Sequence, residues 1–275
     1  MIALIGSGNV AAWIAYRLRD SREFRIGQVY SRNLAHARRI ADGVGAQAID
    51  DITKLSPEAS LYLFSVADDA YGELLPRIPF TMPVALHTAG SVSQRVFEGH
   101  AREYGVLYPL QTFSKDTVYE GLQVPVCLET DHLGASLDSV ERLAAALSDR
   151  YCRMSEPQRA VAHLAAVFAC NFSNAMFSIA DDILKDNGMS LDLLRPLMQQ
   201  TLDKLDSMSP RQAQTGPARR NDSRVMAKHL ETLTDEHWRR IYSAVSDYIR
   251  DVEGEKTERC GSRAEPLHVS PQNDC

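Results

Sequence analysis

The residues with the clearest chemical pattern stand within the first eleven positions, where Gly6, Gly8 and Ala11 have the spacing G-x-G-x-x-G/A. In that pattern the first glycine permits a tight turn, the second lets the backbone approach a pyrophosphate, and the third small residue lets a helix pack closely on a strand. The helix that begins there offers unpaired N–H groups to the phosphates. A tight bend that holds no ligand is the alternative. The coenzyme contacts that we predict in this turn are Gly6, Ser7, Gly8, Asn9 and Val10.

The residues after the second strand-like run bear on which dinucleotide binds. Proteins that bind NAD usually place Asp or Glu about 20 residues after the glycines, where the carboxylate holds the ribose 2′-hydroxyl. Here the run ends in Ser31, Arg32 and Asn33, which offer no carboxylate. Their hydroxyl, guanidinium and amide groups would pair with a 2′-phosphate, which favours NADP as the cofactor. The alternative is that Arg32 is a solvated surface arginine, like Arg38 and Arg39.

Further polar residues follow a strand-like run at the end where open parallel sheets bind their ligands. Ser65, Val66 and Ala67 come first, and we expect them to line the dinucleotide. Asp68 and Asp69 come next and have the types of an acid–base pair, but adjacent carboxylates at a helix start are more often capping residues. We therefore interpret this acidic pair as a cap.

His87 ends another apolar run and is our first candidate for a general acid or base, because a histidine beside a ligand would titrate near neutral pH. The alternative is a histidine that is hydrogen-bonded to its own loop and has no part in catalysis. Thr88, Gly90 and Ser91 then form a small polar bend, which either lets a ligand approach closely or is a plain turn.

The stretch YPLQTFSK follows the next run and carries several polar groups around Pro109. Tyr108 is a second candidate proton donor or acceptor. We expect the loop to hold a carboxylate substrate, with an ordinary strand-exit loop as the alternative. The predicted substrate contacts here are Gln111, Thr112 and Lys115.

Polar residues also stand within the helical pattern that fills the second half of the chain. Asn171 and Asn174 are three apart and therefore neighbours on one helix surface, where they would bond either a substrate or another helix. We take Asn171 as a catalytic candidate and Asn174 as a substrate contact. Arg219 stands where a helix begins and could grip an anionic ligand, and Asp222 has the type of an N-cap.

The elements that must position these residues change character along the chain. From residue 1 to about residue 154, short and mostly continuous apolar runs alternate with helical patterns, which is typical of a parallel sheet covered by helices. After residue 156 only helical patterns remain, near 157–186, 190–208, 222–233 and 235–252. The predicted strands are 2–5, 26–31, 61–66, 84–87, 106–108, 124–129 and 151–154.

This organisation predicts an α/β fold class, a Rossmann-like parallel-sheet domain followed by an all-helical domain. We place the dinucleotide-binding domain at 1–154, the helical domain at 155–252 and a disordered tail at 253–275, where the sequence is polar and has scattered prolines.

Composition excludes several other classes of protein. The chain has 275 residues, of which 44% are hydrophobic and 24% charged, and a net charge of −6, so it offers no broad basic surface for nucleic acid or a membrane. The N-terminus does not fit a secretory signal, and the most apolar later stretch, 160–172, is too short to cross a bilayer, so we expect a cytoplasmic protein. The motifs of metal hydrolases, serine hydrolases and P-loop proteins are absent from the sequence, and we expect no metal.

The stretches IALIGSGNVA, VYSRN, LHTAGSV, YPLQTFSK, AVFACNFSN and QTGPARRND together resemble a family of bacterial proteins, which pair a Rossmann-like domain with a C-terminal helical domain of unknown function. Its members are commonly labelled NADP oxidoreductases. The resemblance covers residues 1–252 and extends to the pyrroline-carboxylate reductase and phosphogluconate dehydrogenase group. It implies a homodimer formed by the helical domain, which completes the active site. The hydroxyacid dehydrogenases of that group carry a catalytic lysine where this chain has Asn171 and Asn174.

Two functions therefore compete. The first is an NADP-dependent oxidoreductase that acts on a small polar, anionic substrate, with His87 or Tyr108 as proton donor or acceptor. The second is an NADP-binding sensor or interaction module without turnover. The missing lysine favours the sensor, whereas the polar loops around the predicted site favour catalysis.

Overall fold

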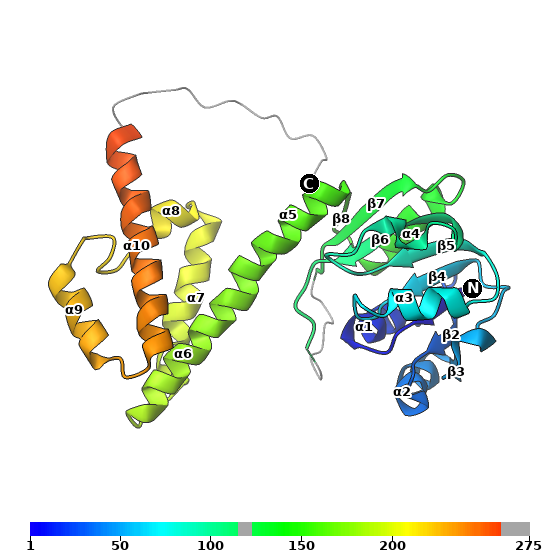
Figure 1. Cartoon of the computed structure of the whole chain (residues 1–275), viewed down its shortest axis with the longest axis horizontal. Coiled ribbons are helices and arrows are strands. Elements are labelled where there is room, and N and C mark those ends of the chain that lie inside the picture. The colour runs from blue at the N-terminus through cyan, green and yellow to red at the C-terminus, as the bar shows by residue number, and fades with distance from the viewer. Residues whose placement is uncertain (115–122, 260–275) are drawn as a thin grey trace. The chain divides into compact units, whose positions relative to one another are not determined.

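A computed structural model describes residues 1–114 and 123–259 of the chain (Figure 1). These residues form two compact units, of which the first comprises Met1–Asn171 and the second begins at Phe172. The strands are β1 Ile2–Ile5, β2 Ile26–Tyr30, β3 Gln47–Ile49, β4 Leu61–Phe64, β5 Met82–His87, β6 Ala101–Pro109, β7 Val126–His132 and β8 Tyr151–Arg153. The α-helices are α1 Asn9–Leu18, α2 Leu34–Val44, α3 Tyr71–Leu74, α4 Leu137–Leu147, α5 Glu156–Ala166, α6 Ser173–Asp186, α7 Arg195–Asp203, α8 Pro210–Ala213, α9 Ser223–Thr232 and α10 Glu236–Arg259.

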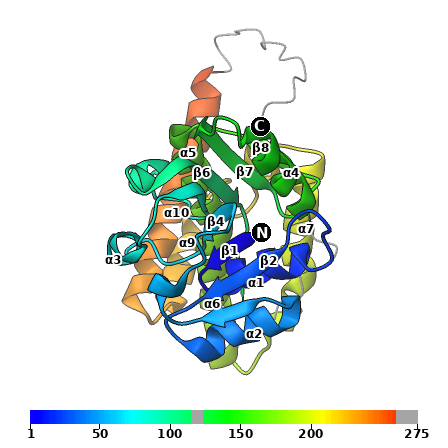
Figure 2. The ribbon, with the colours of Figure 1, turned by 90° about the vertical axis from the view of Figure 1, so that its right-hand side faces the viewer.

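The first unit is built on one eight-stranded sheet with the order β3-β2-β1-β4-β5-β6-β7-β8 (Figure 2). All neighbouring strands are parallel except β6 and β7, which are antiparallel. The predicted α/β class with a Rossmann-like sheet is confirmed. Because the strand order reverses between β1 and β4, the crevice beyond their carboxyl ends is where such a sheet binds ligands.

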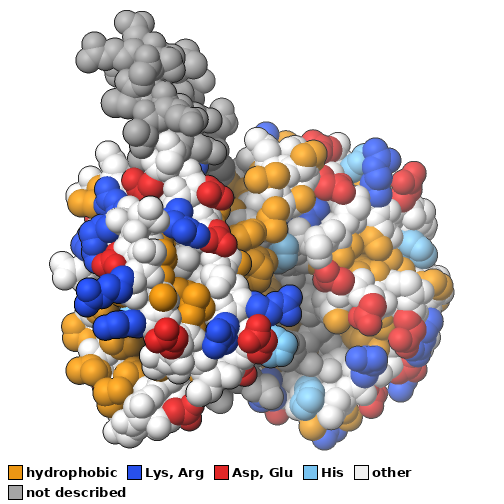
Figure 3. All heavy atoms as spheres, turned by 60° about the vertical axis from the view of Figure 1, so that its left-hand side comes forward, with side chains coloured by type: hydrophobic (Ala, Val, Ile, Leu, Met, Phe, Trp, Pro, Cys, Tyr) orange, Lys and Arg blue, Asp and Glu red, His pale blue; other side chains and the backbone are white. Residues whose placement is uncertain are grey.

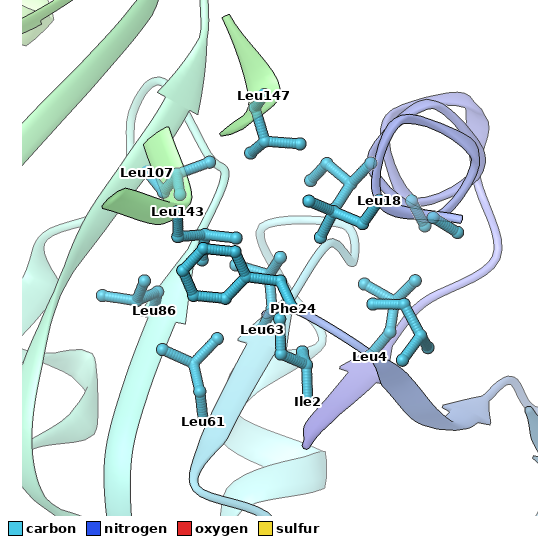
Figure 4. Close-up of a cluster of buried hydrophobic side chains, with 14 of the residues drawn as sticks. Ile2, Leu4, Leu18, Phe24, Leu61, Leu63, Leu86, Leu107, Leu143 and Leu147 are labelled. Carbon is cyan, nitrogen blue, oxygen red and sulfur yellow. The ribbon is translucent and has the colours of Figure 1, made fainter. Parts of the chain in front are cut away.

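Burial explains why the apolar runs form strands. All four residues of β1 and all four of β4 are buried, as expected for central strands with helices on both faces. On one face, side chains from the central strands and from α1 and α4 meet around Phe24 (Figure 4). On the other face, Tyr62, Phe64 and Tyr71 pack with Phe97. The sheet is thus a rigid base for the loops at its edge.

The structure adds two features that the sequence patterns missed. The short strand β3 was not predicted, because its three residues are too few to show a pattern. The strand β6 begins at Ala101, several residues before the predicted 106–108, and its pairing with β7 breaks the parallel order. The other predicted strands agree with the structure to within a few residues at each end.

One continuous helical stretch runs from Glu156 to Asp186 and joins α5 to α6 through the π-helical segment Val167–Phe172. A capping box formed by Ser155 and Gln158 begins it, with Pro157 in its first turn, next to the predicted helix start near residue 157. This stretch of 31 residues is long and apolar enough to cross a membrane by length and composition alone, although 160–172 was judged too short. One such helix is weak evidence, and the described residues contain no other.

The second unit is entirely helical in its described residues, as predicted. Asp222 caps α9 by accepting a hydrogen bond from Val225 N at 3.1 Å, which confirms its predicted role. The helix α10 continues to Arg259, so the prediction of a tail from residue 253 is wrong for 253–259. Residues 260–275 lie outside the described part. The compact units divide after Asn171, whereas the predicted boundary after residue 154 marks the change of secondary structure.

Candidate functional site

The turn after β1 is fixed by a close approach of two backbones. Gly6 has a φ of +125°, which favours glycine, and a Cβ atom there would lie 2.0 Å from the carbonyl oxygen of Ser65. Gly6 N donates to Tyr30 O at 2.9 Å, and Ser65 N donates to Ile5 O at 2.7 Å. The turn therefore lies against the exits of both β2 and β4.

Space for a ligand opens two residues later, at Gly8. Gly8 is the N-cap of α1, and a Cβ atom built on it would meet no heavy atom within 4 Å. No side chain caps this helix, so its first N–H groups remain available for a phosphate. Ser7 and Asn9 hold the turn instead: Ser7 Oγ donates to Ser31 Oγ at 2.8 Å, and Asn9 Nδ2 donates to Phe113 O at 3.1 Å. Val10 packs against the core.

At the end of β2 the three predicted residues have different surroundings. Ser31 is bonded to the first turn through Ser7. Arg32 is exposed and carries no described hydrogen bond or ion pair. Asn33 caps α2, with its side-chain oxygen accepting from Ala35 N at 2.9 Å, so that oxygen is engaged in the helix start. Of the three, Arg32 is the side chain without a described hydrogen bond or ion pair.

After β4, Ser65 and Val66 are partly buried and Ala67 is exposed at the same edge of the sheet. The interpretation of the acidic pair as a cap is wrong, because the N-cap of α3 is Ala70 and no side chain caps that helix. Asp68 instead accepts a hydrogen bond from the hydroxyl of Ser91. This bond joins the loop after β4 to the loop after β5.

The structure contradicts the expectation that His87 titrates near neutral pH. The residue is fully buried between the rings of Tyr71 and Phe97, each with its centroid 5.8 Å away. Burial, with a smaller effect of Arg159, lowers the pKa of His87 to about 3. Its Nδ1 accepts from Ala89 N at 3.2 Å. His87 is therefore the loop-bonded histidine of the alternative interpretation and not an accessible general base.

Tyr108 lies near the carboxyl end of β6 and is bonded to a histidine to which the sequence reasoning assigned no role. Its hydroxyl lies 2.9 Å from His163 Nδ1, and His163 stands on α5. Burial raises the pKa of Tyr108, so the phenol stays protonated at neutral pH. A Cβ atom on Gly90 would lie 2.6 Å from His163 Nδ1, so the loop after β5 lies against the same ring.

A buried ion pair fixes that loop. Arg159, on α5, has a side chain that is 2% exposed, and its Nε donates to Glu129 Oε1 at 2.5 Å. Its other two nitrogens donate to three backbone oxygens of the loop: Nη1 to Ala89 O at 3.1 Å and Gly90 O at 2.6 Å, and Nη2 to Val92 O at 2.7 Å. Sequence reasoning missed this pair. A signal existed, because Glu129 ends the otherwise apolar run predicted as strand 124–129, and a buried carboxylate needs a partner.

The residues predicted to hold a substrate belong to both compact units. Gln111 and Thr112 are exposed and bond one another, with Gln111 Oε1 accepting from Thr112 N at 2.8 Å. Lys115 lies outside the described residues. Asn171 is exposed in the π-helical segment. Asn174 is exposed in the second unit, where Arg219 bonds Gln214 O and faces Glu253 at 3.5 Å.

Comparison with known proteins shows the family to which the chain belongs. Residues 124–249 match the model of a domain of unknown function, DUF2520. BF3122 from Bacteroides fragilis, which carries the name of a presumed NADP oxidoreductase, is 39% identical in sequence and has a TM-score of 0.83 over 91% of this chain and 97% of that one. The chain belongs to the same family of Rossmann-like proteins as BF3122. The resemblance that the motifs indicate is thereby confirmed.

More distant matches share the fold. The structure of a reductive aminase from Aspergillus terreus, in complex with NADPH4, cyclohexanone and allyl amine, has a TM-score of 0.66 and 17% identity over 94% of this chain and 93% of that one. A 1-pyrroline-5-carboxylate reductase from Streptococcus pyogenes has a TM-score of 0.61 and 14% identity over 92% and 98%. An L-aspartate dehydrogenase from Methanothermobacter thermautotrophicus is 30% identical over 79 residues, which span 28% of this chain and only 31% of that protein.

The lowered pKa of His87 predicts how the stability of this protein depends on pH. The folded state keeps His87 neutral down to about pH 3, whereas the unfolded chain protonates it below about 6.5, so stability is lost as the pH falls through this window. Between pH 7 and pH 5 the free energy of unfolding of the wild type should fall by about 2 kcal/mol more than that of His87→Phe. Urea unfolding at the two pH values measures this difference. Equal losses in both proteins would show that His87 is not held neutral.

Proposed function

We propose that the protein is an NADP-dependent oxidoreductase that acts on a small polar, anionic substrate. One observation carries the proposal: an uncapped helix N-terminus with open space at Gly8 stands at the point where the strand order reverses. Backbone N–H groups in that position suit a pyrophosphate. The relatives support the choice, because BF3122 is named for NADP and the reductive aminase structure contains a reduced form of NADP.

The charge at the end of β2 supports NADP over NAD. Arg32 is exposed, and its neighbours Ser31 and Asn33 carry no carboxylate. A guanidinium can bond a 2′-phosphate through two N–H groups, and an acidic neighbour would repel that phosphate. We therefore propose that the guanidinium of Arg32 binds the 2′-phosphate.

When bound, the nicotinamide supplies or accepts the hydride. The residue that we propose as the proton donor or acceptor is Tyr108, because the other candidate, His87, is buried and stays neutral. A phenol is protonated at neutral pH, and burial raises the pKa of Tyr108 further. Its hydroxyl lies 2.9 Å from His163 Nδ1, which donates to it or accepts from it according to the tautomer of the ring. A substrate that accepts hydride at carbon would take this proton on its neighbouring oxygen or nitrogen.

We also propose that the second unit forms a homodimer. In its described residues the buried apolar side chains are only Leu184, Ala218 and Met226, too few for an independent core. Many large apolar side chains are exposed instead, as the orange atoms of Figure 3 illustrate for one face of the molecule. An apolar surface of this kind marks an interface, and a second copy of the chain is the partner that the resemblance implies. The exposed residues are Phe172, Met176, Phe177, Met189, Leu193, Leu197, Leu202, Leu205, Met208, Val245 and Tyr248.

The choice of coenzyme predicts the effect of removing Arg32. Arg32→Ala should weaken NADPH binding by about 10- to 100-fold, the cost of a charge-assisted bond to phosphate, and leave NADH binding unchanged. Isothermal titration calorimetry of both coenzymes measures the two affinities. Arg38→Ala, which removes an exposed arginine from α2, is the matched control and should change neither. An unchanged ratio of the two affinities in Arg32→Ala would contradict the assignment.

Turnover tests the enzymatic proposal itself. The wild type should oxidise NADPH, followed by its absorbance, with at least one member of a panel of keto acids, imines and aldehydes. Tyr108→Phe should lower kcat by about 10²- to 10⁴-fold and keep the affinity for NADPH. Tyr104→Phe removes a hydroxyl from the same strand, on a ring stacked against His132, and should keep full activity. Tight NADPH binding without turnover on any substrate would instead support the sensor.

The proposed dimer predicts a concentration-dependent mass. Leu197 is 63% exposed in the single chain. Leu197→Glu would bury a charge in the interface and should raise the dimer dissociation constant at least about 100-fold. Sedimentation velocity measures the mass, and Lys228→Glu, on the exposed face of α9, is the matched control. A wild type that sediments as a monomer at every concentration would rule the dimer out.

A further inference from the structure

The loop that follows β5, residues 88–92, has carbonyl groups that turn inward. Arg159 gathers three of them, those of Ala89, Gly90 and Val92, at distances of 2.6 to 3.1 Å. The guanidinium is itself held by Glu129. Five planar N–H donors in a rigid fork can fix several acceptors at once, so this loop is set by one buried side chain.

The inward carbonyls dictate where the N–H groups point. In a planar trans peptide the N–H is directed opposite to the C=O, and no described peptide bond is cis. The carbonyls of Ala89 and Gly90 belong to the same peptide groups as the N–H groups of Gly90 and Ser91. Both N–H groups are therefore directed away from Arg159.

These two N–H groups differ from their neighbours. The two preceding ones are used locally, since Thr88 N donates to Phe64 O at 3.0 Å and Ala89 N donates to His87 Nδ1 at 3.2 Å. Neither Gly90 N nor Ser91 N has a partner among the residues that the structure describes. Ser91 is exposed, so a ligand can reach this side of the loop.

A carboxylate stands beside these donors. Asp68 accepts a hydrogen bond from the Ser91 hydroxyl and comes from the loop after β4, at the same edge of the sheet. Two N–H donors next to a fixed carboxylate suit a group that has both an acceptor oxygen and an N–H donor. A primary carboxamide has both, whereas a second carboxylate would be repelled by Asp68.

We propose that Gly90 N–H, Ser91 N–H and the Asp68 carboxylate form a receptor for a primary carboxamide, that of the coenzyme's nicotinamide ring, with Arg159 as the positioning residue. The proposal rests on the proposed function, because it assigns the nicotinamide end of the same coenzyme. The carboxamide oxygen accepts from the two backbone N–H groups, and its NH₂ group donates to Asp68. This contact would fix which edge of the ring faces the loop after β5.

Two coenzyme analogues test the two halves of the receptor in the full-length protein. The nicotinic acid analogue of NADP⁺ replaces the NH₂ group with a charged oxygen, and the thionicotinamide analogue replaces the acceptor oxygen with sulfur, a weaker acceptor. Calorimetry of the wild type should show binding at least about tenfold weaker for the acid analogue than for NADP⁺. Equal affinities for the acid analogue and for NADP⁺ would overturn the carboxamide receptor and leave the proposed function intact. If NADP⁺ itself did not bind, the proposed function would be overturned as well.

Two pairs of variants assign the effects to residues. Asp68→Asn keeps an acceptor for Ser91 and should reduce the tenfold discrimination against the acid to below about threefold, whereas Asp69→Asn, the same change one residue away, should preserve it. Arg159→Lys cannot hold three carbonyls and should reduce the preference for NADP⁺ over the thio analogue, with Arg142→Lys, an exposed pair of Glu23, as the control. Equal effects of Asp68→Asn and Asp69→Asn would overturn the proposal even if Arg159→Lys does not fold.

Discussion

The close approach of the backbone at Gly6 to the carbonyl of Ser65 is the constraint on which the site depends. Only a residue without a Cβ atom fits there, and its φ of +125° turns the chain from β1 into α1 within three residues. The N-terminus of α1 is thereby placed directly beyond the exits of β1 and β4. Every functional group that we assign in the first unit is arranged around this edge of the sheet.

A second constraint, the buried pair of Arg159 and Glu129, fixes the loop after β5. Its guanidinium makes four hydrogen bonds, three of them to one loop. Removing either Arg159 or Glu129 would leave the other charged group buried without its opposite charge. The same helix also carries His163, which bonds Tyr108. The helix α5 therefore positions both the loop and the tyrosine, and does so within the first unit.

The parts of the fold that follow from local pattern could be predicted from the sequence. Continuous apolar runs indicated the central strands, and the glycine spacing indicated the turn, because both are properties of neighbouring residues. The sequence could not show that His87 is buried between two rings or that Asp68 bonds Ser91, because these depend on contacts between distant segments. The pairing of Arg159 with Glu129 is of the same kind, although a lone charge at the end of the apolar run 124–129 indicates that some partner exists.

The central claim is that backbone N–H groups at the first turn bind the pyrophosphate of a dinucleotide. Hydrogen–deuterium exchange of the amides from Gly6 to Ala12, with and without saturating NADPH, tests it most directly. The account predicts slower exchange of the amides at the start of α1 when NADPH is bound, because a phosphate then accepts from them. Binding of NADPH that leaves these amides exchanging at the same rate would contradict it.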